Sequence, residues 1–304
     1  MLQKKLWKNS RGALTGATLL LLLLALGGWP ELVARAVARL PEKPQGAVAE
    51  TANPSQKNVE DGFQDEAERE LTRLLNQERI QQGLPAFAPD ERLVQSSRAH
   101  SLRMAEQRLL SHGLPSEPEL PQRMAEAGIR FDRSGENVAF GPDVLAIHRG
   151  LMNSPGHRAN ILHRDFTAVG IGIVLRHEQL WVTQNFARRL AFQTAESAEA
   201  LLVREFEQLR RKSGQKPLQR EQVRGLREAA CRMASTGTLS TSEAKNLFGA
   251  GGSAAFSGAE IGGLPSEWRK IADYPGLSRY AVAVCFQKSP KLPSGGYWAV
   301  MVFQ

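Results

Sequence analysis

His157 is the residue in this chain whose surroundings most clearly suggest chemistry. It lies in Ser154-Pro155-Gly156-His157-Arg158, which has the pattern of a helix start. We expect Ser154 to cap the helix with its hydroxyl, and Pro155 to occupy the first helical position, where a missing N–H costs little. The positive end of the helix dipole would then keep His157 neutral, which suits a metal ligand, a base or a hydrogen-bond acceptor. The alternative is a histidine that only packs at a helix end.

His112 and Glu136 are two further candidates, and both are next to a glycine. His112 follows the end of a predicted helix, so we expect it in a loop, where functional side chains concentrate. Glu136 lies at the entry to a short extended segment that follows a loop. His100 and His148 fall within predicted helices. His148 is expected to be a core residue, and no role is assigned to His100.

The net charge of +8 does not indicate a nucleic-acid partner. Four of the positive charges lie within the first eleven residues, at Lys4, Lys5, Lys8 and Arg11. The other Lys and Arg residues are mixed with Asp and Glu, as on an ordinary solvated surface. The chain shows no cysteine-rich metal signature, phosphate-binding loop or dinucleotide fingerprint.

Residues 1–30 predict a targeting segment, either a cleaved signal peptide or an N-terminal membrane anchor. Basic residues precede an apolar run centred on Leu19 to Leu24, and Ala25-Leu26-Gly27 offers a cleavage site. The run at 13–29 is also long enough for a short membrane span. Both alternatives export the rest of the chain. Residues 31–64, with three prolines among polar residues, predict a linker.

The region 65–192 is expected to be an α+β domain. Helical spacing of apolar residues and short apolar runs bounded by polar turns indicate its elements. They are helices over 65–82, 89–109 and 122–127, a helix opened by Pro142-Asp143, and a hairpin of strands over 168–174 and 180–186.

Several short motifs follow one another in this region. They are His112, Gly135-Glu136-Asn137, Ser154-Pro155-Gly156-His157-Arg158, Gly170-Ile171-Gly172 and Trp181-Val182-Thr183-Gln184-Asn185-Phe186. Each is weakly specific alone, but their order resembles the bacterial branch of the CAP superfamily. This superfamily comprises the cysteine-rich secretory, antigen 5 and pathogenesis-related 1 proteins, also called SCP domains. The resemblance implies an α-β-α sandwich with a small antiparallel sheet between layers of helices.

The same resemblance implies a cleft where two histidines and acidic residues meet. Carried over residue by residue, the histidines are His112 and His157, and the first acid is Glu136. A second acid of the animal and plant members would fall near Leu151 and Ser154, so it is expected to be absent. The three polar residues could bind a divalent metal such as zinc, with water completing the coordination. The alternative is a buried hydrogen-bonded cluster that fixes the loops.

Residues 197–304 are expected to be a second, degenerate CAP-like unit. Phe206 to Gly214 matches Leu75 to Gly83, and Trp298 matches Trp181. Thr241 stands in place of His112, and Leu277 follows the Pro-Gly that corresponds to Pro155-Gly156. The stretch Gly249 to Gly263 is rich in Gly, Ala and Ser, and predicts a flexible loop.

Both cysteines of the chain, Cys231 and Cys285, lie in this second unit. One falls on a predicted helix and the other on a predicted strand. In an oxidising compartment they could form a disulfide. The alternative is two buried thiols, since a sequence does not supply the distance between them.

These features lead to an exported, non-enzymatic binding module in the cell envelope or outside the cell. The resemblance implies a lipid or other apolar ligand, a divalent metal, or both. The rival function is a hydrolase of peptide or cell-wall material, in which His112, His157 and Glu136 would activate metal-bound water. No residue lies in a diagnostic nucleophile motif, so none is assigned as catalytic, and a purely structural scaffold is the third alternative.

Overall fold

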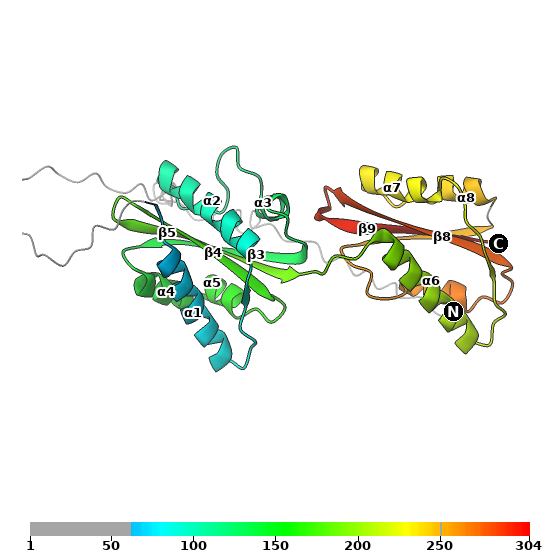
Figure 1. The fold of residues 1–304 in the computed structure, drawn as a ribbon, viewed down its shortest axis with the longest axis horizontal. Helices are drawn as coiled ribbons and strands as arrows, with labels where there is room; N and C mark the ends of the chain where they lie inside the picture. Colours follow the sequence, from blue (N-terminus) through cyan, green and yellow to red (C-terminus); the bar gives the residue numbers. More distant parts are fainter. Residues whose placement is uncertain (1–61, 250) are drawn as a thin grey trace, which may run out of the picture. The chain divides into compact units, whose positions relative to one another are not determined.

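The computed structural model describes residues 62–249 and 251–304 (Figure 1). The expected targeting segment at 1–30 and linker residues 31–61 lie outside the described residues. Among the described helices, none combines the length and apolar character needed to cross a membrane.

The N-terminal part, residues 62–192, has one sheet between two layers of helices. Strand order in the sheet is β1-β4-β5-β3, with β2 beside β4. The hairpin β4-β5 and the pair β3-β5 are antiparallel, whereas β2 runs parallel to β4. The elements are β1 (Gly62–Phe63), α1 (Asp65–Gln81), β2 (Ala88–Pro89), α2 (Glu91–Gln107), α3 (Leu120–Glu126), β3 (Phe131–Gly141), α4 (Val144–Asn153), α5 (Pro155–Ile161), β4 (Ala168–Arg176) and β5 (Gln179–Arg189).

The α-β-α sandwich expected for this part is confirmed. Helices α2 and α3 cover one face of the sheet, and α1, α4 and α5 cover the other (Figure 1). Side chains of β4 alternate between the faces, as a strand requires. Ile171 and Ile173 pack with α1 and α4, whereas Val174 packs with α2. Strand β3 is longer than expected, and Glu136 lies in its middle rather than at its entry.

Two glycines of β4 allow α2 to lie directly on the sheet. A Cβ atom at Gly170 would come within 2.2 Å of the backbone of Leu93, and one at Gly172 within 2.2 Å of the amide nitrogen of Arg98. Ser97 Oγ donates to the carbonyl of Gly170, and Ser101 Oγ to that of Gly172, each at 2.9 Å. These contacts fix the position of α2, which carries His100.

The C-terminal part, residues 193–304, has a second sheet with strand order β6-β8-β9-β7. Again β8-β9 and β7-β9 are antiparallel and β6 is parallel to β8. The elements are α6 (Ala195–Lys212), β6 (Gln219–Arg220), α7 (Leu226–Thr236), α8 (Ser242–Phe248), β7 (Gly252–Gly258), α9 (Ser266–Ala272), β8 (Arg279–Ser289) and β9 (Leu292–Phe303). The flexible loop expected over 249–263 is wrong over its middle part, because residues 252–258 form β7 and pair with β9.

Strand β9 is buried on both faces. Met301 packs with residues of α6 and α9, whereas Val300 and Val302 pack with residues of α7 and α8. All three side chains are fully buried. A continuous apolar run is typical of a strand covered on both sides.

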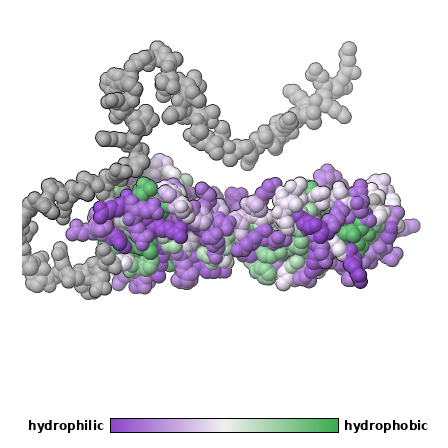
Figure 2. Space-filling view, turned by 90° about the horizontal axis from the view of Figure 1, so that it is seen from above, coloured by the Kyte–Doolittle hydropathy of each residue, from purple (hydrophilic) through white to green (hydrophobic). Residues whose placement is uncertain are grey.

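The surface seen in Figure 2 is mostly hydrophilic, with smaller hydrophobic areas.

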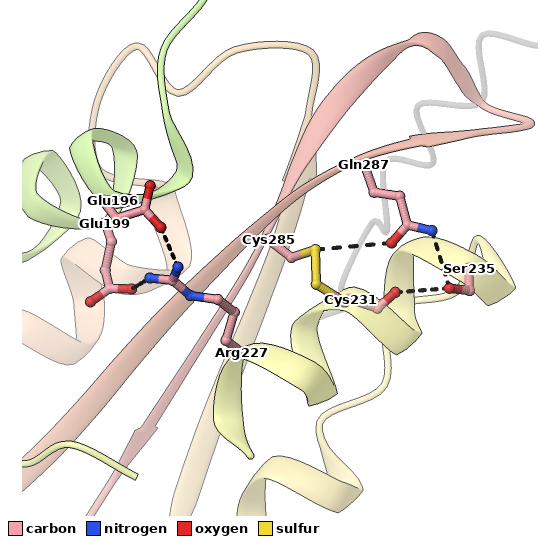
Figure 3. Close-up of a disulfide and its surroundings, with 7 residues drawn as sticks. All are labelled: Glu196, Glu199, Arg227, Cys231, Ser235, Cys285 and Gln287. Carbon is pink, nitrogen blue, oxygen red and sulfur yellow. Dashed lines mark hydrogen bonds and ion pairs between the residues drawn. A yellow bond between two sulfur atoms is a disulfide. The ribbon is translucent and has the colours of Figure 1, made fainter. Parts of the chain in front are cut away.

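Cys231 and Cys285 form a disulfide that joins α7 to β8 (Figure 3). Their Cα atoms are 5.2 Å apart, within the range that a disulfide spans. The structure thus favours the disulfide over two buried thiols. Beside it, the Ser235 hydroxyl donates to the carbonyl of Cys231 and the Gln287 amide donates to Ser235. Arg227 of α7 forms ion pairs with Glu196 and Glu199 of α6.

Candidate functional site

His112, Glu136 and His157 come from three different elements of the N-terminal part. His112 lies in the loop after α2, Glu136 in β3, and His157 in the first turn of α5. His112 Nδ1 is 3.0 Å from Glu136 Oε1. The pKa of His112 is raised, mainly by this hydrogen bond. The pKa of His157 is lowered by burial and by the nearby charge of His112.

The start of α5 is partly as expected. Pro155 takes the first helical position, and Ser154 is the N-cap residue. The Ser154 hydroxyl, however, makes no capping hydrogen bond among the described residues, so that expectation is wrong. The expected lowering of the His157 pKa is correct in direction, but burial is its largest cause.

Two asparagines bind the strand that carries Glu136 to the helix that carries His157. The Asn137 side chain donates to the carbonyl of His157 at 3.1 Å. The Asn160 side chain donates to the Asn137 side chain at 2.9 Å and to the carbonyl of Glu136 at 3.1 Å. This network gives the two motifs a fixed relative position.

Glu136 is buried, and both of its carboxylate oxygens have partners. Oε1 contacts His112, and Oε2 accepts a hydrogen bond from Arg123 at 2.9 Å. Arg123 also donates to the carbonyl of His112 at 3.1 Å. The carboxylate therefore orients the His112 ring, and Arg123 holds both members of the pair.

A second acid, Glu117, lies in this cluster, although the sequence has no acid at the positions near Leu151 and Ser154, as expected. The Glu117 side chain is 2% exposed, and its Oε2 is 2.7 Å from His100 Nδ1. Its Oε1 is 3.3 Å from Arg103 and 3.8 Å from Arg123. The acid comes from the loop that holds His112, not from the positions near Leu151 and Ser154.

His100, to which the sequence assigned no role, is fully buried inside the same cluster. Its Nε2 lies 2.9 Å from the carbonyl of Ser111 and 4.0 Å from Glu136 Oε1. The sequence did not identify His100 as a member of the cluster, because it lies in the middle of α2. Helical spacing predicts that a residue is buried, but not which side chains it contacts. The only local signal was a polar residue on the buried face of a helix. His148, by contrast, lies on α4, buried and 3.4 Å from Glu78, as expected of a core histidine.

An apolar cavity of about 360 Å³ adjoins His157. It lies between β3 and the helices α4 and α5. Its lining includes Leu110, Val138, Phe140, Ile147, Leu151 and His157. The His112 side chain is 62% exposed and so is accessible to a ligand. The site therefore combines an apolar cavity, lined in part by His157, with an accessible histidine, His112.

In the described ranges, no group of three or more His, Cys, Asp and Glu side chains is already arranged to hold a metal ion. The donor set nevertheless fits a metal held by two imidazoles. His112 Nδ1 is hydrogen-bonded to Glu136, which leaves its Nε2 for coordination, and burial lowers the pKa of His157, which favours its neutral form. A carboxylate that orients a ligating histidine is a frequent second-shell partner of metals.

Comparisons with known proteins identify one family over this part of the chain. Residues 72–186 match the model of the cysteine-rich secretory protein family, CAP. An uncharacterized protein of Bacillus subtilis (strain 168), YkwD, is 36% identical over 118 residues, which cover 38% of this chain and 46% of that protein. An uncharacterized membrane protein of the same organism, YlbC, is 32% identical over 128 residues, covering 42% of this chain and 36% of that one.

Among solved structures, an extracellular protein containing an SCP domain from Bacillus anthracis is 31% identical, with a TM-score of 0.38 over 40% of each chain. The chain spans less than half the length of each of these relatives. The matched segment contains every residue of the site described above. Over residues 72–186, therefore, the chain carries a domain that matches the cysteine-rich secretory protein (CAP) family, and its relatives over this region include bacterial proteins.

Proposed function

We propose that this protein is an exported, non-enzymatic binding module. Its site takes a lipid or other apolar ligand in the cavity beside α4 and binds a divalent metal, with zinc as the expected ion, through His112 and His157. The observation that carries the proposal is the location of His157. It lines the apolar cavity, and it lies near enough to His112 for the charge of His112 to lower its pKa.

Glu136 supports metal binding in a way that the sequence did not suggest. It was expected as a third ligand, but its two carboxylate oxygens are hydrogen-bonded to His112 and Arg123. We therefore assign it the orientation of His112, and water would complete the coordination of the metal.

Export has two supports in the chain. The basic N-terminus followed by a leucine run has the composition of a targeting segment. The Cys231–Cys285 disulfide is typical of proteins that fold in oxidising compartments. The relatives point the same way, because one is described as a membrane protein and another as extracellular. Residues 13–29 would attach the protein to the membrane if the targeting segment is retained.

We also propose that the C-terminal part is a degenerate second copy of the CAP unit. Its strands pair in the same pattern as β2, β4, β5 and β3 of the N-terminal part. Thr241 and Leu277 stand where the first copy has His112 and His157, so this part would bind no metal.

Titration calorimetry with zinc tests the metal site. We expect one zinc ion per chain in the wild type and a loss of most of the binding heat in His112→Ala and in His157→Ala. Binding should weaken sharply below about pH 6, because protons compete with the metal for the imidazoles. His177→Asn is the matched control. His177 lies in the β4–β5 turn at a φ of 53°, which asparagine tolerates. Equal heats for all four proteins would exclude the proposed ligands.

One observation favours the rival function, hydrolysis of peptide or cell-wall material. The contact between His112 and Glu136 is of the kind that orients a general base. Turnover of peptide and cell-wall substrates by zinc-loaded protein, lost in Glu136→Gln, would replace the binding module with a hydrolase. Metal binding without turnover of either substrate supports the module.

A further inference from the structure

The end strand of the second sheet, β7, has an unpaired edge. Among the described residues it pairs only with β9, in continuous register from Gly252 opposite Phe303 to Gly258 opposite Tyr297. Its sequence, Gly-Ser-Ala-Ala-Phe-Ser-Gly, contains no charge and no proline. Edge strands are normally protected by charged residues, prolines or bulges, which prevent another strand from pairing with them. Strand β7 has none of these.

The corresponding end strand of the first sheet, β3, is protected. It carries charged residues, among them Asp132 and Arg133, and a register shift near its start. In addition, Asn160 of α5 donates a hydrogen bond to the backbone carbonyl of Glu136. The C-terminal part has no helix between α9 and β8, and so has no counterpart of α5. Strand β7 therefore lacks a helix that would bind its edge, as α5 binds the edge of β3.

A cavity of about 540 Å³ lies along this edge. Its lining includes Ser253, Ala254 and Ala255 of β7 together with Ile271, Tyr274 and Phe303. We call this cavity, together with the unpaired edge of β7, the β7 groove. Consecutive residues of a strand point to opposite faces. Ala254 packs with the core under α6 and α9, and Ala255 with the core under α7 and α8. A cavity that touches both residues therefore opens at the edge of the strand.

We propose that the β7 groove binds an extended, uncharged segment of a partner polypeptide, which adds to the sheet beside β7. Backbone N–H and C=O groups along a strand edge are matched by another extended backbone. The Gly, Ser and Ala side chains of β7 are small enough to let such a backbone approach. Ile271, Phe303 and the 62% exposed Tyr274 would receive one large apolar side chain of the segment.

The charges beside the groove define the partner further. Lys270 and Glu267 both line the cavity, and they form an ion pair with each other at 3.0 Å. The groove thus offers no unmatched charge, and β7 offers none either. A charged side chain placed there would lose water without gaining an ionic partner. This favours an uncharged segment over an acidic or basic one.

Fluorescence anisotropy with labelled nonapeptides tests the proposal on the full exported chain. The probes are uncharged, capped peptides that alternate Thr and Val, with Ala, Val or Phe at the central position. We expect affinity to rise from Ala to Phe, because the central side chain enters the cavity. Tyr274→Ala should weaken binding of the Phe peptide about tenfold. Leu239→Ala, another exposed apolar residue of the C-terminal part, is the control and should bind normally.

Backbone methylation of the Phe peptide separates strand addition from simple filling of a pocket. N-methyl groups on one alternate set of residues should abolish binding, and those on the other set should not, because only one edge of a strand pairs with β7. Amide exchange of Ser253 to Ser257 should slow when the peptide binds. Absence of binding by all three peptides, or equal effects of both methylation patterns, would overturn the proposal. Self-association of the peptide-free chain that Tyr274→Ala abolishes would also overturn it, in favour of a second copy as the occupant.

Discussion

Arg79 and Arg210 make the same set of hydrogen bonds in the two parts of the chain. Each guanidinium is almost fully buried and binds three backbone carbonyls. Those bound by Arg79 belong to Pro85, Ile161 and His163. Those bound by Arg210 belong to Lys216, Ala272 and Tyr274. In each part the arginine lies near the end of the first long helix and holds the loop after it, together with the segment before the central hairpin.

This equivalence predicts matched effects of two substitutions. Arg79→Met and Arg210→Met should each lower the free energy of unfolding by about 3 kcal/mol, because three carbonyls lose a charged donor inside the protein. Urea denaturation monitored by tryptophan fluorescence measures the effect. Trp181 reports on the N-terminal part, and Trp268 and Trp298 on the C-terminal part. Arg149→Met, on the exposed face of α4, is the control. A loss in one part without a loss in the other would contradict the structural equivalence.

The pKa of His112 should depend on Glu136. In metal-free Glu136→Gln, we expect this pKa to fall toward its ordinary value, because the hydrogen bond to a carboxylate is its main cause. NMR titration of the imidazole measures the change. Glu119→Gln, an exposed acid in the same loop, should leave the titration nearly unchanged. An unaltered His112 pKa in Glu136→Gln would disprove the coupling.

The same variant should show a pH-dependent difference in stability. The folded-state pKa of His112 is raised, so its contribution is fully present below the unfolded pKa and is lost as pH rises through the folded pKa. The stability difference between wild type and Glu136→Gln should therefore shrink from acidic to alkaline pH. The part that persists at alkaline pH measures the contact of Glu136 with Arg123. A difference that does not change with pH would mean that His112 contributes nothing.

Gly172→Ala should destabilise the N-terminal part by about 3 kcal/mol, because the added methyl group would overlap the backbone of α2. Displacement of α2 should also move His100 and weaken zinc binding. Thermal unfolding and zinc titration measure the two effects. Gly150→Ala is the control, since a Cβ atom there meets nothing within 4 Å and alanine favours a helix. Equal melting of wild type and Gly172→Ala would show that α2 does not lie this close to β4.

Loss of the disulfide should destabilise the C-terminal part. The bridge joins residues 54 positions apart, a separation at which a disulfide contributes about 4 kcal/mol by restricting the unfolded chain. Cys231→Ser combined with Cys285→Ser should lower the unfolding midpoint by a corresponding amount. Reductant should lower the midpoint of the wild type and leave the double variant unchanged. A reductant effect on both proteins would point to a cause other than this bridge.

Local patterns in the sequence determined most of the first sandwich. Helices α1 and α2 follow from apolar residues at helical spacing. The start of α2 at Glu91 is close to the expected one, and Asp90, expected inside the helix, is its N-cap and accepts a hydrogen bond from the amide of Arg92. The β4–β5 hairpin follows from two apolar runs around a polar turn, where His177 and Glu178 adopt positive φ values. The order of short motifs likewise singled out His112, Glu136 and His157. Each of these signals is contained within a few neighbouring residues.

Only the tertiary structure decided which other residues join them. Glu117 and His100 belong to the cluster because the loop after α2 folds back over that helix, a contact that no local pattern encodes. Strand β7 shows the same limit, because a Gly, Ala and Ser composition favours a loop until β9 offers it a pairing partner. The bond between Cys231 and Cys285 depended on the approach of α7 to β8. Periodicity and capping act between near neighbours, whereas burial, strand pairing and side-chain contacts depend on segments that only the folded chain brings together.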